Sequence, residues 1–450
     1  MSACQDLLDL LRSHGRAEAM VSSERSLSFD ELLAMVAAFE AQFAGAGIGP
    51  GSVVAIEGDF SPGGVASLLA AIKSRVIAIP LTPSVAAKKS EFHSLAQTEW
   101  ILTLDAQEQG TLTRTGLVAG SDLIQELRRR GNPGLILFSS GSTGRSKAVV
   151  HDMELLTRKY LRPRHSFRTL AFLMFDHIGG VDTLLYNLAN GSCLVTIPDH
   201  SPEKVCQAIE RHRAEVLPTS PTFLNLMLIG GAHTTRDLSS LKIITYGAEV
   251  MSTATLDRLR EAFPDVKLMQ KFGTTEVGTL RSQSRDSGSV WVRIGGEGYE
   301  TRVRNGLLEI KAESAMLGYL NAPSPFTEDG WFMTGDAVEV DGEWMRILGR
   351  ETEIINVGGE KVYPAEVENV LQTMENVAEV TVTGEPNPLT GNVVVARFRL
   401  IHPEEPSVFR NRVRTFCQER LERFKTPARI TITGDAQHNA RFKKMRLQEP

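Results

Sequence analysis

A short stretch rich in serine, threonine and glycine carries the clearest chemical potential in this sequence. It runs Ser139-Ser-Gly-Ser-Thr-Gly-Arg-Ser-Lys147 and lies between two apolar runs. Glycines let a backbone approach an anion closely, hydroxyls and backbone N–H groups donate hydrogen bonds, and Lys147 adds a positive charge. These properties suit a phosphate chain. A plain hairpin turn with a lysine at its edge is the alternative interpretation.

The stretch does not meet the ATPase P-loop pattern, because Gly144 is followed by Arg145. It resembles the phosphate loop of the adenylate-forming superfamily, which includes acyl- and aryl-CoA synthetases, luciferases and the adenylation domains of nonribosomal peptide synthetases. Ser146 and Ala148 stand where that loop usually has Pro and Gly. The resemblance implies contacts to ATP phosphates, with Thr143 also catalytic. The implied nucleotide-binding residues of this loop are Ser139, Ser140, Gly141, Ser142, Thr143, Gly144 and Lys147.

A second motif is Ile243-Ile-Thr-Tyr-Gly-Ala-Glu249, which is typical of a strand that ends in a turn. Ligands of open α/β sheets bind at the carboxyl ends of strands. In the superfamily this turn lies along the adenine and the acid pocket. The resemblance therefore implies nucleotide contacts for Gly247, Ala248 and Glu249, and substrate contacts for Tyr246 and Gly247. An ordinary strand-end turn is the alternative.

The segment Phe272-Gly-Thr-Thr-Glu276 resembles a further superfamily motif, and it follows the phosphate loop in the same order. An aromatic ring such as Phe272 can stack on adenine, and Thr275 can donate a hydrogen bond to the α-phosphate. Glu276 offers a hard oxygen ligand that suits Mg²⁺. The resemblance implies nucleotide binding by Phe272, Gly273, Thr274 and Thr275, and a catalytic metal-binding role for Glu276.

Two later motifs resemble the superfamily's ribose contacts and its hinge. Asp336 ends the run Thr-Gly-Asp and can accept hydrogen bonds from ribose hydroxyls, and Arg350 is implied to contact ribose and phosphate. Thr352 stands at the hinge position, where Asp or Lys is usual. Gly358 and Gly359 suit a tight hairpin, which in relatives lines the channel for a pantetheine arm.

The C-terminal run Asn439-Ala-Arg-Phe-Lys-Lys-Met-Arg446 could be a basic solvated tail. It also resembles the superfamily motif that carries the lysine of adenylation. Lys443 aligns with that lysine and is implied to be catalytic and to contact the nucleotide. Phe442 stands where Gly is usual, and Lys444 is the rival for the catalytic role.

The substrate class depends on Phe175-Asp-His177. A lone histidine is more often structural than functional. The resemblance implies substrate contacts for His177, as in acyl- and aryl-activating relatives, or for Asp176, which would hold the ammonium of an amino acid. The motif itself allows both.

The elements that must position these residues alternate between helical and strand patterns. Expected elements are a helix opened by Ser28, a strand over 53–57, a helix over 65–72, strands over 76–81, 377–384 and 393–400, and a helix over 408–425. Helices between short apolar strands imply βαβ units and a largely parallel sheet.

We therefore expect an α/β protein of two domains, since 450 residues exceed one compact core. The resemblance implies a large N-terminal domain of mixed sheets with packed helices, residues 1–349, which binds ATP and the carboxylate. A small, mobile α+β lid, residues 350–450, would carry the catalytic lysine.

Composition narrows the partners. The formal net charge is −5 and the Lys and Arg residues are spread along the chain, which argues against a nucleic acid partner. The most apolar stretch is interrupted by Lys73 and Arg75, so we expect no membrane span. Four scattered cysteines and the absence of a signal-peptide layout favour a cytoplasmic protein. The sequence leaves the oligomeric state open.

The chemistry implied by the resemblance is ATP- and Mg²⁺-dependent conversion of a carboxylic acid to an acyl-adenylate, followed by transfer to a pantetheine thiol. The chain ends soon after Arg446 with no carrier domain, so the acceptor would be CoA or a separate phosphopantetheinyl carrier protein. A compact acyl-CoA synthetase acting on an acyl or aryl acid is favoured. The alternatives are a free-standing amino-acid adenylation enzyme that loads a carrier protein, and a non-catalytic nucleotide-binding relative.

Overall fold

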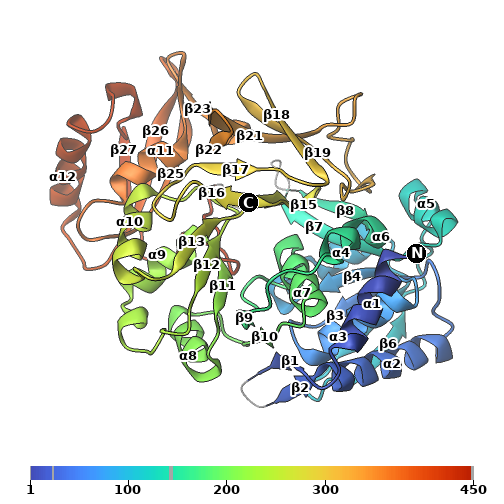
Figure 1. Ribbon diagram of the computed structural model, residues 1–450. Coiled ribbons are helices and arrows are strands. Elements are labelled where there is room, and N and C mark those ends of the chain that lie inside the picture. Colours follow the sequence, from blue (N-terminus) through green and yellow to red (C-terminus); the bar gives the residue numbers. More distant parts are fainter. Residues whose placement is uncertain (1, 23–24, 141–144, 447–450) are drawn as a thin grey trace.

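The structure is a computed structural model and describes residues 2–22, 25–140 and 145–446 (Figure 1). In this part of the chain, two seven-stranded sheets, a six-stranded sheet and a five-stranded C-terminal sheet carry the fold, with one two-stranded ribbon. Helices cover the two seven-stranded sheets, as expected for a mixed α/β protein.

The first seven-stranded sheet is parallel except at one edge, where its last two strands pair antiparallel. In spatial order its strands are β13 (Lys267–Gln270), β12 (Ile243–Tyr246), β11 (Val216–Thr219), β9 (Thr169–Leu170), β10 (Leu194–Val195), β1 (Glu18–Val21) and β2 (Ser26–Ser28). The carboxyl ends of β11, β12 and β13 therefore lie side by side, and ligands bind at such ends.

The second seven-stranded sheet has a parallel centre and antiparallel edges. In spatial order its strands are β20 (Gly318–Tyr319), β8 (Ser146–Asp152), β7 (Gly134–Ser140), β4 (Ile77–Leu81), β3 (Val53–Glu57), β5 (Trp100–Leu104) and β6 (Gly110–Arg114). The antiparallel strands β7 and β8 flank the predicted phosphate loop and place Ser139 opposite Lys147. Residues 141–144 of that loop lie outside the described residues.

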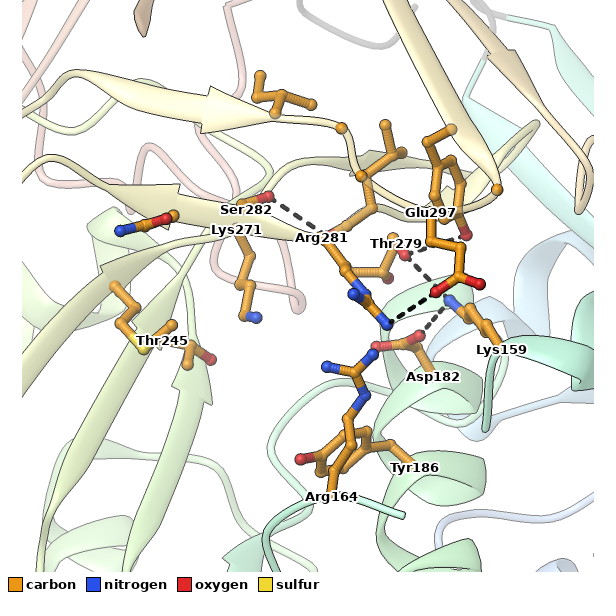
Figure 2. A pocket seen from close by; sticks show the side chains of 18 of the residues that line it. Lys159, Arg164, Asp182, Tyr186, Thr245, Lys271, Thr279, Arg281, Ser282 and Glu297 are labelled. Carbon is orange, nitrogen blue, oxygen red and sulfur yellow. Dashed lines mark hydrogen bonds and ion pairs between the residues drawn. The ribbon is translucent and has the colours of Figure 1, made fainter. Parts of the chain in front are cut away.

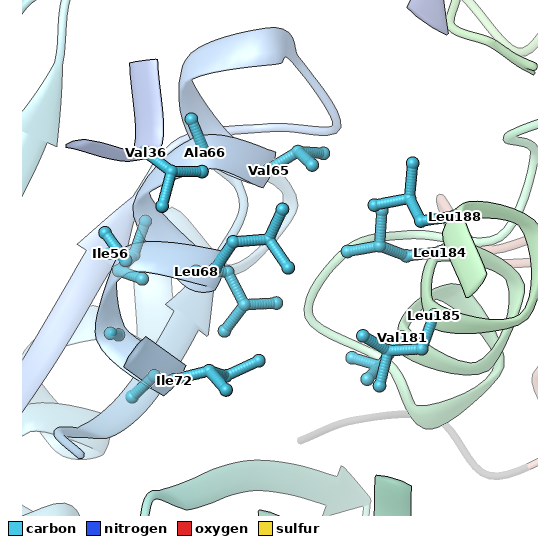
Figure 3. Packing of buried hydrophobic residues seen from close by; sticks show 14 of the residues in the cluster. Val36, Ile56, Val65, Ala66, Leu68, Ile72, Val181, Leu184, Leu185 and Leu188 are labelled. Atoms are coloured by element: carbon cyan, nitrogen blue, oxygen red, sulfur yellow. The ribbon is translucent and has the colours of Figure 1, made fainter. Parts of the chain in front are cut away.

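Alternate side chains of the second sheet enter two different cores. Leu135 and Leu137 of β7 pack into one hydrophobic cluster, whereas Ile136 and Phe138 pack into another. A strand buried on both faces needs apolar residues at every position, which explains the continuous apolar runs in the sequence. The helices between the two sheets are α1 (Ala3–Ser13), α2 (Phe29–Gly45), α3 (Pro62–Lys73) and α7 (Ile178–Ala189), and leucines of α7 face α3 (Figure 3).

The remaining helices of this region are short. On the outer side of the second sheet lie η1 (Pro83–Lys88), α4 (Lys89–Ala96) and α5 (Asp122–Arg130). Against the first sheet lie α8 (Pro202–His212), α9 (Pro221–Ile229) and α10 (Thr253–Ala262). The connecting helices are α6 (Met153–Thr157), η2 (Arg158–Tyr160) and η3 (Ala232–Thr234).

The six-stranded sheet is antiparallel throughout. In spatial order its strands are β16 (Ser282–Ser284), β17 (Val292–Ile294), β22 (Trp344–Arg350), β21 (Phe332–Asp341), β19 (Leu307–Ala312) and β18 (Tyr299–Arg304). The two-stranded ribbon β14 (Gly273–Thr274) and β15 (Gly278–Thr279) connects the first sheet to it. The pairing of β21 with β22 places Asp336 directly opposite Arg350.

The C-terminal region folds around its own hydrophobic cluster, drawn from residues 355–432. Its elements are η4 (Glu351–Glu353), β23 (Ile355–Val357), β24 (Glu360–Val362), α11 (Pro364–Leu371), β25 (Val377–Asn387), β26 (Gly391–Leu400), α12 (Pro406–Gln418), η5 (Arg423–Lys425) and β27 (Arg429–Ile432). The expected helix over 408–425 is too long, because α12 ends at Gln418 and the chain turns so that Leu421 and Phe424 pack back on the cluster. The boundary at residue 350 stays a prediction.

Most N-terminal expectations agree with the structure. Ser28 caps α2 in a capping box with Glu31, and the strand over 53–57 is β3. All four cysteines are buried and free. Among the described residues, no helix combines the length and apolar character needed to cross a membrane.

The start of α7 provides a test of the fold, because it fixes His177. A Cβ on Gly180 would lie 1.9 Å from the Met174 backbone oxygen, whereas a Cβ on Gly179 would meet the flexible Leu173 side chain at 2.9 Å and touch the His177 ring at 3.4 Å. We expect Gly180→Ala to lower the free energy of unfolding by about 3 kcal/mol and the control Gly179→Ala by roughly 1 kcal/mol. Urea unfolding measures both, and equal losses would contradict this account.

Candidate active site

A narrow cavity of about 140 Å³ lies where the carboxyl ends of β11, β12 and β13 meet the start of α7 and the C-terminal tail. Predicted site residues on its wall are His177, Tyr246, Gly247, Ala248, Phe272, Gly273 and Lys443. These residues come from four separate parts of the sequence. The fold therefore gathers much of the predicted constellation around one cavity.

A buried carboxylate anchors the tail that carries Lys443. Glu368 of α11 is 1% exposed and binds both nitrogens of the Arg446 guanidinium fork, at 2.9 and 2.8 Å. Lys444 Nζ reaches the same carboxylate at 3.0 Å. Burial alone would raise the pKa of Glu368, but Arg446 and Lys444 outweigh it and hold that pKa at about 2. Lys444, the other candidate for the catalytic lysine, is thus held in an ion pair, whereas Lys443 lines the cavity.

Phe442 has an unusual backbone conformation for a large residue. Its φ is +52°, in the left-handed region that glycine adopts most easily, which gives a physical reason for the Gly usual at this position. Its ring contacts Phe223 edge-on with 5.3 Å between centroids and stacks on His438 at 5.2 Å. Ser220 Oγ also donates to the Phe442 carbonyl at 2.8 Å. These contacts offset the backbone cost and hold the tail on α9.

Lys443 and His177 meet inside the cavity. Lys443 Nζ lies 3.3 Å from His177 Nε2, and the Gly179 N–H donates to His177 Nδ1 at 3.2 Å. Burial, with Lys443 and Arg441 nearby, holds the pKa of His177 well below its usual range, so the ring is neutral. Because Nδ1 accepts from Gly179, the ring proton lies on Nε2, so this N–H and the Lys443 ammonium are two donors that do not bond each other. Both can donate to a carboxylate oxygen that enters the cavity. Burial and the charge of Arg441 lower the pKa of Lys443 to about 8.

Asp176 is held by other residues of the protein. Its Oδ2 accepts from Thr82 Oγ1 at 2.9 Å and pairs with Arg441 at 3.1 Å, and it is not part of the cavity wall. Oδ1 is buried without a hydrogen-bond partner among the described residues. The structure thus gives this carboxylate partners within the protein. The predicted substrate contact of Asp176 has no support from its placement.

The turn after β12 closes one side of the cavity. Ala248 has φ +68°, and a Cβ on Gly247 would lie 2.6 Å from the Lys271 carbonyl oxygen, so the turn packs tightly against the next strand end. Glu249 accepts from Thr222 Oγ1 at 2.7 Å and from the Lys444 backbone N–H, which ties the turn to the tail. The Tyr246 ring is buried in the hydrophobic cluster below this turn.

The segment after β13 presents both apolar and polar groups. Phe272 packs in the cluster with Val277 and also lines the cavity. Thr274 Oγ1 is buried without a hydrogen-bond partner in the described part of the chain. The Thr275 carbonyl accepts from the buried His151 Nε2 at 2.7 Å. Burial lowers the pKa of His151 to about 4, so this histidine is neutral and structural.

Glu276 and Lys147 both contact the same side chain, Tyr319. Tyr319 O–H donates to Glu276 Oε1 at 2.8 Å, and Lys147 Nζ lies 5.0 Å from the centroid of the Tyr319 ring. Glu276 Oε2 receives no hydrogen bond from a described residue. One free carboxylate oxygen suits Mg²⁺, which binds one or two carboxylates and keeps several waters. Within the described residues, no group of three or more His, Cys, Asp or Glu could hold a metal by itself.

Asp336 and Arg350 form the predicted ribose-contacting pair on neighbouring strands. Arg350 Nε lies 3.4 Å from Asp336 Oδ1. Burial raises the pKa of Asp336 from 3.8 to about 6, although Arg350 partly opposes that effect. A carboxylate kept in an unfavourable environment is a common property of functional sites.

Gly358 and Gly359 form the tip of the β23–β24 hairpin. Their φ values are +61° and +92°, which a two-residue turn between antiparallel strands requires. Neither glycine lines the narrow cavity. Their pantetheine-channel role stays a prediction, as do the roles of Gly141, Ser142, Thr143 and Gly144, which lie outside the described residues.

Comparison with protein families decides the relationship. The model of the AMP-binding enzymes matches residues 84–295, and that of the AMP-binding enzyme C-terminal domain matches residues 366–443. The chain belongs to the AMP-binding enzyme family. The resemblance to the adenylate-forming superfamily is thereby confirmed, and Lys443 is the last residue of the second matched region.

Several curated relatives of this AMP-binding enzyme are CoA ligases. It is 26% identical to indoleacetate–CoA ligase of Aromatoleum aromaticum over 93% of this chain and 91% of that protein. It is 28% identical to oxalate–CoA ligase of Arabidopsis thaliana over 89% and 88%. A Mycobacterium tuberculosis CoA ligase for a methyl-dioxo-octahydroindenyl propanoate is 31% identical over 70% of this chain and 65% of that protein.

Solved structures share the fold. An anthranilate CoA ligase in complex with anthranoyl-AMP superposes with a TM-score of 0.83 at 21% identity, over 99% of this chain and 95% of that one. ATP-bound MatB from Rhodopseudomonas palustris gives 0.81 at 21% identity, over 98% and 97%. These similarities confirm the large N-terminal and small C-terminal architecture.

Sequence reasoning missed several residues of this site. Tyr319 contacts Glu276 only because β20 pairs with β8, and Arg441 reaches Asp176 only through the tail. Lys271 lines the cavity directly after β13. The Gly-Tyr pair at the start of β20 was a visible signal for Tyr319, whereas no local pattern marked Arg441 or Lys271.

The raised pKa of Asp336 predicts that its ionised carboxylate lowers the stability of the folded protein while it supports nucleotide binding. The folded protein holds a proton on Asp336 between pH 3.8 and about 6, so stability falls as pH rises through this window. We expect Asp336→Asn to be more stable than the parent by about 1–3 kcal/mol at pH 8, with little gain at pH 4, and to bind ATP more weakly.

Urea unfolding at both pH values and calorimetric ATP binding measure these effects. Glu339→Gln is the matched control, because Glu339 lies on the same strand and is exposed. An equal gain in the free energy of unfolding at both pH values would show that ionisation of the buried Asp336 carboxyl does not cost stability.

Proposed function

We propose that this AMP-binding enzyme converts a carboxylic acid to an acyl-adenylate with ATP and then transfers the acyl group to CoA. The main support is the position of Lys443. The anchored tail places this residue on the wall of the cavity that His177 and the turn after β12 also line. The indoleacetate, oxalate and other CoA ligases among its relatives support the same chemistry. A free carrier protein remains a second acceptor to test.

In the first step, a carboxylate oxygen of the acid attacks the α-phosphorus of ATP, the bond to the β-phosphate breaks, and pyrophosphate leaves. Negative charge on the phosphate oxygens must be met by groups already in place. Lys443 supplies an ammonium at the cavity, and Lys147 supplies one at the base of the phosphate loop. His177, with a proton on Nε2, orients the attacking carboxylate.

The nucleotide would lie along Gly247–Glu249 and Phe272–Thr275, with its ribose against Asp336 and Arg350. Glu276 is the fitting ligand for Mg²⁺, which would neutralise charge on the phosphates. The closed position of the tail covers the cavity and limits the access of water to the mixed anhydride.

In the second step, a pantetheine thiol attacks the acyl carbonyl carbon, a thioester forms and AMP leaves. Lys443 lines the cavity in this conformation, and the Gly358–Gly359 hairpin does not. The second step therefore requires the C-terminal region to move. Thr352, within η4, is the candidate hinge residue.

The acid is an acyl or aryl acid rather than an amino acid. Asp176, the only candidate that we assigned to an α-ammonium, is already bonded to Thr82 and Arg441. His177 instead faces the cavity with a neutral ring that suits a carboxylate. Acid-dependent pyrophosphate release with ATP and Mg²⁺, with and without CoA, tests the proposal. Release that requires an amino acid, or that ignores CoA, would replace it by the carrier-loading alternative.

Two adjacent lysines provide the sharpest test of the assignment. We expect Lys443→Ala to lower the rate of acyl-adenylate formation by about 10²–10⁴-fold, because it removes the cation that meets the developing charge. ATP binding, measured by calorimetry, changes little. Lys444→Met removes an ion pair with Glu368 and lowers thermal stability, but it retains most of the adenylation rate. The opposite pattern would assign the role to Lys444.

The lowered pKa of Lys443 predicts a limit on the alkaline side. With a pKa of about 8 in the free enzyme, the ammonium loses its proton as pH rises, so kcat/KM for ATP falls above about pH 8. Lys443→Arg keeps its charge to higher pH and moves the falling limb upward, even where its maximal rate is lower. If the alkaline fall of kcat/KM occurs at the same pH in Lys443→Arg as in the parent, another titrating group causes it.

A further inference from the structure

The narrow cavity adjoins a second, much wider one of about 1650 Å³. Six residues line both: Asp182, Thr183, Pro218, Thr245, Lys271 and Thr279. An acid whose carboxylate lies at His177 and Lys443 therefore extends past these residues toward the wide cavity. They face the far end of the acid, where one substrate differs from another.

Lys271 is the cation at this junction. It follows β13 directly and extends from its strand into the cavity (Figure 2). The structure gives its ammonium no hydrogen bond and no ion pair with any residue that it describes, and burial lowers its pKa. Asp182 is the carboxylate whose negative charge opposes the lowering of the Lys271 pKa. Its Oδ1, however, already accepts from Lys159 Nζ at 2.5 Å and from Tyr160 O–H at 2.8 Å.

The surroundings of Lys271 are polar on the side of the shared wall. Thr183, Thr245 and Thr279 bring hydroxyl groups to the junction, whereas Leu173, Ile178 and Phe172 are apolar and line only the narrow cavity. An unbranched apolar chain that covered Lys271 would remove water from an unpaired ammonium, which is strongly unfavourable. An anionic group at the same place would pair with it.

The wide cavity has the charge that such an acid requires. Its lining has twice as many Lys and Arg as Asp and Glu side chains. Arg162 pairs with Glu297, and Arg293 pairs with Glu343 at 3.2 Å. Arg281 also approaches Glu297, at 4.0 Å, whereas Arg164 has no ion pair with a described residue (Figure 2). A surplus of positive charge on the walls of a cavity raises the local concentration of anions.

We infer that the acid is a dicarboxylic acid: one carboxylate is activated beside His177 and Lys443, and the second binds Lys271 at the junction of the two cavities. This inference rests on the proposed adenylation function and specifies the acid. Lys271 is a specificity-determining residue, since it contacts the part of the substrate that does not react. The adenylation step itself is unchanged, because only the first carboxylate becomes the anhydride.

The test compares unbranched dicarboxylic acids with the monocarboxylic acids of equal carbon number. We expect the parent protein to favour the best diacid over its matched monoacid by at least about tenfold in kcat/KM for acid-dependent pyrophosphate release. Lys271→Met lowers kcat/KM for the diacid by about ten- to a hundredfold and raises that for the monoacid. Lys271→Arg keeps the preference for the diacid.

Lys267→Met is the matched control, because Lys267 begins the strand that Lys271 directly follows and lines only the wide cavity. It leaves the preference unchanged. A parent protein that favours monoacids, or a Lys271→Met variant with an unaltered preference, would overturn the inference while pyrophosphate release with any acid still supported the proposed function.

Calorimetric binding of the same acids keeps the two proposals distinguishable. Tighter binding of the diacid by the parent, lost in Lys271→Met, supports the inference even where no acid releases pyrophosphate, an outcome that would overturn the proposed function. Equal binding of diacid and monoacid to both proteins would overturn the inference directly. Thermal unfolding confirms that each variant is folded.

Discussion

The arrangement of the active site depends on one buried ion cluster. Glu368 is removed from water and paired with Arg446 and Lys444. A buried carboxylate is costly unless opposite charges and hydrogen bonds replace its lost water, and here its neighbours do so. Because both cations lie within the last residues of the described chain, the cluster fixes the tail on α11. Lys443, directly before these two anchored residues, lines the cavity.

This constraint explains the position of Phe442 beside it. A tail held at residues 444 and 446 must reverse direction to present Lys443, and the reversal requires a left-handed residue. Most chains would use glycine there. Phe442 instead trades backbone strain for aromatic contacts with Phe223 and His438, so the same residue that bends the tail also holds it against the N-terminal region. The bend of the tail and its contact with the N-terminal region are therefore coupled in one short segment.

Local sequence signals predicted the elements well and the long-range contacts poorly. The capping box of Ser28, the alternation in β25 and β26 and the loop between β7 and β8 follow from residue types that act within a few positions. The helix expected over 408–425 was wrong at its end, because tertiary packing of Leu421 overrides helical periodicity. The motifs named the candidate residues only through the family resemblance. Arg441 and Tyr319 were missed since their partners lie far away in sequence.

The fold explains why the proposed nucleotide side of the site tolerates fewer substitutions than the proposed acid side. The residues proposed to face the nucleotide lie on hairpins and tight turns, where a Cβ on Gly247 would clash with the Lys271 backbone oxygen and few changes are tolerated. The residues proposed to face the far end of the acid lie on α7, on β11, β12 and β15, and directly after β13, and they line the wide cavity. One side chain such as Lys271 can change there without disturbing the strand that carries it. The same scaffold can therefore keep one reaction while its cavity accepts acids of different charge.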